Sequence, residues 1–146
     1  MIEKIHLTVG TTCVKDGKVL MVEEKQNGRL VINQPAGHVE PGETLKGAAL
    51  RETLEETGYH IELTAILGLS AFPAKNGITY YRVSFLASCP DQTPRANLDP
   101  DIERAFWMTP DEISRADNHR SQMVQMDIDR FLNGRKFPLD MIAENP

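Results

Sequence analysis

Three glutamates in the first half of the chain have a spacing that could hold a metal ion. Glu52, Glu55 and Glu56 stand at positions i, i+3 and i+4, so on a helix their carboxylates share one face. Like charges at this spacing repel one another, and a divalent cation that neutralises them is the economical reason for placing them there. Mg²⁺ binds carboxylate oxygens and usually keeps substrate phosphates among its ligands. The spacing therefore predicts metal-dependent chemistry on a phosphate; the alternative is a solvated acidic helix face.

A turn and a helix should position these carboxylates. Pro41-Gly42 breaks the chain, and Thr44 is placed to cap the helix that follows. We expect this helix to end at Thr57, because Gly58 is a typical helix stop.

The faces of this helix predict how the glutamates are presented. At about 100° per residue, Ala48 and Ala49 lie between the directions of the outer glutamates, so we expect them to leave that face open to a cation and a phosphate. Leu50 and Leu54 point the opposite way, which predicts that they face the core. Arg51 lies one turn before the middle glutamate and can hold its carboxylate.

The rest of the chain reads as strands and two later helices. Apolar and β-branched runs between turn signals predict strands at His6–Val14, Lys18–Glu23, Leu30–Asn33, Ile61–Ser70, Ile78–Ser88 and Arg104–Met108. A proline-rich loop should span residues 89–101, and Pro110 should start a short helix. We expect a last helix capped by Ser121 and closed by Gly134, with a core-facing side made of Met123, Val124, Ile128, Phe131 and Leu132.

The stretch from Gly37 to Tyr59 resembles the Nudix box, G-x5-E-x7-R-E-U-x-E-E-x-G-U, where U is bulky and apolar. Its fixed positions are all filled, by Gly37, Glu43, Arg51, Glu52, Glu55, Glu56 and Gly58. The two U positions depart from the pattern, since they hold Thr53 and Tyr59. We expect these departures to weaken a local core contact and to leave the charged set intact.

The resemblance implies an α+β protein with the Nudix fold, a mixed β-sheet sandwiched between α-helices (α/β/α), formed by residues 1–146 as a single Nudix hydrolase domain. It implies hydrolysis of a phosphoanhydride bond, with Mg²⁺ as the cofactor and Mn²⁺ as a possible substitute. A nucleotide-binding module without catalysis and a prenyl diphosphate isomerase are alternatives on the same fold. Both would be expected to lose parts of the box, which is complete here.

The resemblance also implies roles for individual residues. Glu52 is the leading candidate for the general base, and Glu55, Arg51 and Glu43 join it in the catalytic set; for Glu43 a purely structural role at the helix start is equally open. The implied metal ligands are Ala36, through its backbone carbonyl, and the carboxylates of Glu52, Glu55, Glu56 and Glu103. Glu103 is preferred over Asp99 and Asp101 because the family often places an acid four residues before the tryptophan found here at position 107.

Outside the box, the motifs at 33–40, 101–107, 118–121 and 137–142 resemble the NudJ-type phosphatases of this family. That resemblance implies substrates such as nucleoside di- and triphosphates or thiamine-type pyrophosphates, with release of orthophosphate. Pro73 keeps open an alternative, a pyrophosphatase for ADP-ribose or another nucleoside diphosphate linked to a group X. The candidate substrate contacts are Arg29, Gln34, Arg82 and Tyr80, with Lys25, Arg120, His38, Phe72 and Tyr81 as further options.

Size and composition limit the remaining possibilities. The chain has 146 residues, which suits one domain, and its net charge of −5 argues against a nucleic-acid partner. Cys13 and Cys89 form no CxxC, and we expect buried free thiols in a reducing compartment. We expect no signal peptide at the start, and no stretch reaches the ~20 apolar residues that cross a bilayer. We therefore expect a cytoplasmic monomer or homodimer that acts on a small phosphorylated substrate.

Overall fold

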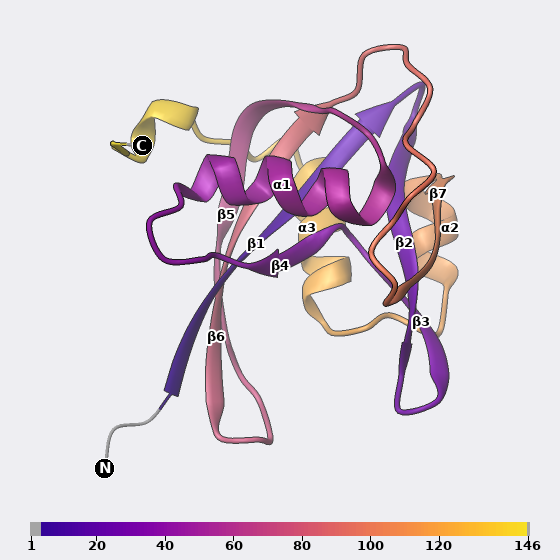
Figure 1. The fold of residues 1–146 in the computed structure, drawn as a ribbon, viewed down its shortest axis with the longest axis horizontal. Coiled ribbons are helices and arrows are strands. Elements are labelled where there is room, and N and C mark those ends of the chain that lie inside the picture. Colours follow the sequence, from indigo (N-terminus) through magenta and orange to yellow (C-terminus); the bar gives the residue numbers. More distant parts are fainter. Residues whose placement is uncertain (1–3, 146) are drawn as a thin grey trace.

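The computed structural model describes residues 4–145, built around a seven-stranded mixed sheet (Figure 1). Its strands are β1 (Lys4–Lys15), β2 (Lys18–Gln26), β3 (Arg29–Asn33), β4 (Ala36–His38), β5 (Glu62–Pro73), β6 (Ile78–Ser88) and β7 (Ile102–Met108). Five of them lie in the order β3-β2-β1-β6-β5, while β4 pairs with β1 and β7 pairs with β2. The β1–β6 pair is parallel and every other pair is antiparallel. β4 therefore carries the start of the box along one side of β1.

Helices cover both faces of this sheet, as expected. The helices are α1 (Leu45–Thr57), α2 (Pro110–Arg115) and α3 (Met123–Leu132), followed by a short 3-10 helix, η1 (Leu139–Met141). In Figure 1, α1 lies in front of the strands, and α2 and α3 lie behind them. One core cluster joins α1 to β1, β5 and β6, and a second joins α2 and α3 to β2 and β3. The α+β sandwich expected from the sequence is confirmed.

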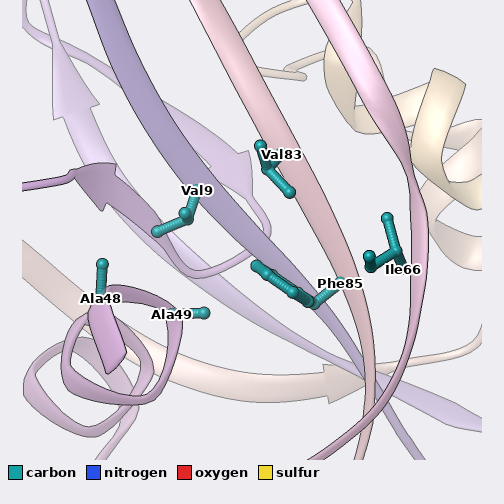
Figure 2. Packing of buried hydrophobic residues seen from close by; sticks show 6 residues of the cluster. All are labelled: Val9, Ala48, Ala49, Ile66, Val83 and Phe85. Carbon is teal, nitrogen blue, oxygen red and sulfur yellow. The ribbon is translucent and has the colours of Figure 1, made fainter. Parts of the chain in front are cut away.

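The two alanines of α1 face the sheet, which contradicts the expected open face. Ala48 and Ala49 are 0% and 1% exposed and belong to the core cluster that contains Val9 and Phe85 (Figure 2). Leu50, expected in the core, is 41% exposed. The expectation was wrong because the small side chains let the helix backbone approach the strands closely, so the glutamates beside the alanines are pressed against the sheet.

Thr53, the polar residue at an apolar box position, does not weaken the core. It is fully buried, and its hydroxyl lies 2.8 Å from that of Thr11 on β1 and donates to the Ala49 carbonyl at 2.8 Å. The second departure, Tyr59, contacts Trp107 edge-on and accepts a hydrogen bond from its indole N–H at 3.3 Å. Both positions are satisfied by partners from other elements, so the expected loss of packing is not found.

The ends of α1 match their sequence signals. The Thr44 hydroxyl accepts from the backbone N–H of Gly47 at 2.9 Å, and Gly58 follows the helix with a φ of 79°. A Cβ at Gly58 would overlap the backbone of Arg95, so the glycine is needed both for its conformation and for the loop packed on it.

The last helix differs in detail from the prediction. Its N-cap is Gln122, one residue later than expected, although the Ser121 hydroxyl accepts from the Met123 N–H at 3.2 Å. Leu132, expected in the core, is the last residue of α3 and is 59% exposed, so that part of the prediction was wrong. Cys13 and Cys89 are buried free thiols, as predicted. Within residues 4–145, no helix is long and apolar enough to cross a membrane.

Candidate active site

About half of the predicted site residues line one cavity of about 1310 Å³, while Arg51, Glu43 and Glu55 lie outside its lining. Glu52 and Glu56 reach it from α1, and Ala36 and Gly37 reach it from β4. The lining also includes residues of β1, the ends of β2, β3 and β5, the first half of β6, the loop before β7 with the start of that strand, and the start of α3. A cavity of this size can hold a ligand as large as a nucleotide.

Gly37 makes room for the first glutamate. A Cβ at this position would overlap the Glu52 carboxylate, whose side chain is 14% exposed. The carboxylate therefore lies directly over the backbone of β4, where a larger residue would displace it. Burial raises the pKa of Glu52, an effect that its ion pair with Arg51 opposes.

Glu56 is the most deeply perturbed carboxyl of the site. One of its oxygens accepts from the backbone N–H of Ala36 at 2.9 Å. Burial raises the pKa of Glu56 to about 9, the Ala36 hydrogen bond opposes this, and the charges of Glu52, Glu24 and Asp99 add to the increase. In the metal-free protein this group therefore holds a proton at neutral pH, and a cation could take the place of that proton.

Arg51 organises the acidic cluster, but its main partner is Glu43 and not Glu55 as we expected. Its Nε and Nη2 donate to the two Glu43 oxygens at 2.6 and 2.9 Å, in a bidentate pair. Its Nη1 donates to Glu52 at 2.8 Å and to Glu55 at 3.3 Å, and Nη2 also reaches the His38 carbonyl at 3.1 Å. The Arg51 guanidinium lowers the pKa of Glu43 to about 2. This pair ties α1 to the loop before it.

The comparisons with known proteins agree with this geometry. A model of the NUDIX domain matches residues 4–126. The chain belongs to the Nudix family. It is 36% identical over 141 residues to proteins named Phosphatase NudJ from Shigella sonnei (strain Ss046) and Escherichia coli (strain K12), which covers 97% of this chain and 92% of each relative. The protein is therefore a Nudix hydrolase, an enzyme of a family that generally uses divalent metal ions and acts on small phosphorylated substrates.

Solved structures support the same assignment. A Nudix hydrolase from Nitrosomonas europaea has a TM-score of 0.91 and 36% identity, over 97% of this chain and 98% of that one. A MutT Nudix hydrolase from Burkholderia pseudomallei has a TM-score of 0.74 at 22% identity, over 88% of this chain and 98% of that one. The second match shows the shared fold alone.

The carboxylate oxygens of the Nudix box are suitable ligands for a hard divalent cation. Glu52 and Glu56 present oxygen donors to the cavity, and a bound cation would lower the raised pKa values of both carboxyl groups. Within residues 4–145, no three Asp, Glu, His or Cys side chains are already arranged around a metal position. This agrees with the contacts above, because Arg51 holds Glu52 and Ala36 holds Glu56.

The two acidic residues near the start of β7 that could bind a metal, Asp99 and Glu103, lie in different surroundings. Glu103, the predicted ligand, lines the cavity, but its side chain is 47% exposed and lies 3.8 Å from Lys25. Asp99 is anchored to the helix, because its backbone N–H donates to the Glu55 carbonyl at 2.8 Å. Asp99 is among the charges that raise the pKa values of both cavity glutamates of α1. Glu103 remains a predicted ligand, and Asp99 is a second candidate.

Glu24 is a site residue that sequence reasoning missed. It lines the cavity from β2, its side chain is 14% exposed, and it pairs with Arg120 at 3.0 Å. Its charge also raises the pKa of Glu56. The only sequence signal was a second acid following Glu23 in a strand, which is an ordinary pattern for an exposed strand end.

The predicted substrate contacts are only partly brought together. Tyr80 and Arg82 line the cavity. Gln34 is fully buried, where its amide donates to the Val124 carbonyl at 3.0 Å and accepts from Arg82 at 3.2 Å. Arg29 lies outside the described cavity lining and donates to the Asp117 carbonyl at 3.0 Å. In this arrangement Gln34 supports Arg82 rather than the cavity, and Arg29 would have to move to reach a substrate.

Proposed function

We propose that the protein hydrolyses a phosphoanhydride bond in nucleoside di- or triphosphates or in thiamine-type pyrophosphates, with Mg²⁺ as cofactor and orthophosphate as a product. The observation that supports this most strongly is the pair of buried glutamates, Glu52 and Glu56, which line a nucleotide-sized cavity with raised pKa values. The similarity to the proteins named Phosphatase NudJ extends over nearly the whole chain and favours release of phosphate. A cytoplasmic location and a monomeric or homodimeric state stay predictions.

The proposed roles are to hold the cation and to move a proton, and Glu52 is assigned to both. Glu56, Glu52 and Glu55 would hold the cation, with the Ala36 carbonyl and Glu103 as further oxygen donors. Mg²⁺ in this site would supply positive charge to the phosphate oxygens and make a neighbouring water more acidic. Glu52 is our general base, because its carboxylate is held over Gly37 at the cavity surface.

Arg51 and Glu43 do not need to touch the substrate to matter. Their bidentate pair fixes the loop of Glu40–Glu43 against the helix, and the remaining guanidinium N–H orients the Glu52 carboxylate. Such supporting partners hold catalytic ligands in their productive geometry.

A second activity is favoured by one observation. Pro73, which suggests a pyrophosphatase for ADP-ribose or another nucleoside diphosphate linked to a group X, lines the same cavity next to Phe72. The two activities differ in the bond that is cut. The phosphatase releases orthophosphate, whereas the pyrophosphatase releases a nucleoside monophosphate and a phosphorylated X.

A substrate panel with product identification tests both. Purified protein is incubated with Mg²⁺ and nucleotides, thiamine pyrophosphate or ADP-ribose, and the products are separated as orthophosphate, pyrophosphate and nucleoside monophosphate. Orthophosphate release that stops with EDTA and in Glu56→Gln is expected. Glu62→Gln, at an exposed position of β5, is the matched control and should keep full activity. Turnover that is unchanged in Glu56→Gln would refute the site assignment.

A further inference from the structure

The last part of the chain crosses the edge of the sheet and reaches the box helix. Phe137 exchanges two backbone hydrogen bonds with Ile66 of β5, both of 2.8 Å, and Leu139 and Ile142 pack against the core cluster that contains the α1 alanines. In Figure 1 the C-terminal end lies beside the first turn of α1. We call residues 137–144 the C-terminal strap. Its first six residues form one of the motifs noted in the sequence, yet no described residue of the strap lines the cavity.

Glu144, near the end of the strap, binds two backbone donors of α1. Its partly buried carboxylate accepts from the N–H of Leu45 and, through its other oxygen, from the N–H of Lys46 at 3.3 Å. The N–H groups at the start of a helix have no partner within the helix. The Thr44 hydroxyl accepts from only one of them, that of Gly47. The two donors before it therefore depend on a residue 99 and 98 positions further along the chain.

The start of α1 is weak by its own sequence. It has no acidic residue in its first turn to interact with the positive end of the helix dipole, and Lys46 places a positive charge there instead. Gly47 in the same turn is a poor helix former. Glu43 lies just before the helix, but both of its oxygens accept from Arg51. Glu144 therefore supplies a negative charge that the local sequence does not provide.

The ends of α1 matter because its middle is held by small side chains. Ala48, Ala49 and Thr53 make its buried contacts with the sheet. Small side chains interdigitate little with the strands, so they oppose a shift along the helix axis less than large ones would. Glu52 lies about 10 Å from the start of the helix, at about 1.5 Å per residue, and its carboxylate lies over Gly37. A shift of about 1 Å in such a group can lower a reaction rate about 100-fold.

We propose that Glu144 is a positioning residue for the box glutamates and acts through the first turn of α1. At its other end α1 is held by a loop, since the backbone N–H of Arg95 donates to the Gly58 carbonyl at 2.9 Å. Held at both ends, α1 presents Glu52 and Glu56 to a cation in one position. The inference rests on the proposed function, which assigns the cation to these carboxylates.

Glu144→Ala tests this role in the full-length protein. Hydrogen exchange of the Leu45 and Lys46 amides, followed by NMR in EDTA, should become about ten-fold faster. The calorimetric affinity for Mg²⁺ should fall about ten-fold, as when a partner that orients metal ligands is removed. Asp140→Ala, at an exposed acid of the same strap, is the matched control and should change neither quantity. Unchanged amide exchange or unchanged Mg²⁺ affinity in Glu144→Ala would overturn the proposal.

A second substitution separates positioning from simple helix stabilisation. Lys46→Glu puts an acid in the first turn of α1 and should restore much of the Tm lost in Glu144→Ala, without reconnecting the strap. The affinity of the double variant for Mg²⁺ should stay low relative to Lys46→Glu alone, which corrects for the added charge. Full recovery of that affinity would make Glu144 an ordinary helix cap and refute the positioning role. If Glu144→Ala does not fold, Glu144→Gln, which keeps one acceptor oxygen, should show smaller changes of the same kind.

The outcomes keep this inference distinct from the proposed function, because amide exchange is measured without metal or substrate. Faster exchange and weaker Mg²⁺ binding in Glu144→Ala, in a protein that releases no phosphate from any substrate, would support the role of the strap and refute the hydrolase proposal. Phosphate release by a wild-type protein whose Mg²⁺ affinity does not depend on Glu144 would do the opposite.

Discussion

Replacing Glu56 by glutamine should stabilise the metal-free protein, and the gain should grow with pH. Burial raises the pKa of Glu56 from an ordinary 4.5 to about 9 in the folded state. Below pH 4.5 the carboxyl is protonated in both the folded and the unfolded chain, so it costs nothing. As pH rises from 4.5 to 9, folding must take up a proton, and stability falls by about 1.4 kcal/mol per pH unit.

The size of the effect follows from that interval. At pH 7 the proton uptake costs about 3–4 kcal/mol, from 2.5 pH units at about 1.4 kcal/mol each. Glutamine carries no titrating proton, and its side-chain oxygen can still accept from the Ala36 N–H that Glu56 uses. The variant should therefore lose the pH dependence and keep the hydrogen bond.

Urea unfolding of both proteins in EDTA, at several pH values from 5 to 9, measures the difference directly. Groups that titrate elsewhere in the chain cancel in the comparison, and Glu62→Gln on the exposed edge of β5 controls for the change in net charge. Mg²⁺ should stabilise the wild-type protein and release protons on binding, and both effects should shrink in the variant. Parallel stability curves, or a variant that is less stable at pH 8, would refute the reasoning.

Other substitutions separate activity from stability. Gly37→Ala should lower kcat by about 100-fold with little change in Tm, because the new methyl group meets only the movable end of the Glu52 side chain. Gly58→Ala should instead lower Tm and reduce the free energy of unfolding by about 1–3 kcal/mol, because alanine would have to adopt a φ of 79° and would clash with the backbone of Arg95. Arg51→Lys should weaken Mg²⁺ binding about ten-fold in calorimetry, since lysine cannot make the bidentate pair; an unchanged affinity would contradict this. Thr53→Val should cost about 1–3 kcal/mol in urea unfolding by removing the hydroxyl partner of Thr11, with Mg²⁺ affinity unchanged.

Local signals explain what could be predicted from the sequence. The cap at Thr44, the stop at Gly58 and the shared face of the box glutamates depend on residues within a turn or two, and the structure confirms the two ends of the helix. The side of α1 that faces the sheet depends instead on distant strands. Judged by hydrophobicity, Leu50 belongs in the core, but close packing favoured Ala48 and Ala49.

Residues brought in from distant elements could not be predicted. Gln34 reads as a polar residue beside the box, yet its burial depends on Arg82 and Val124, which lie 48 and 90 residues further along the chain. Glu24 enters the cavity because β2 pairs with β7 and β3. The local sequence around Gln34 and Glu24 does not show these contacts and strand pairings. Whether a polar residue of this kind is structural or functional can therefore be decided only once the fold is known.

The contacts of Arg51 explain why the box carries an arginine beside so many acids. If the guanidinium neutralised the metal-binding glutamates, a cation would have to compete with it for every oxygen. Its bidentate pair is instead with Glu43, an acid outside the cavity lining of the described chain, and a single nitrogen, Nη1, is shared between Glu52 and Glu55. Among the described residues Glu56 receives only a neutral backbone donor, so no cationic side chain compensates its ionised form. The Arg51–Glu43 pair therefore joins the loop to the helix, and its two charges cancel. The carboxylates that still need a cation are the buried ones that face the cavity.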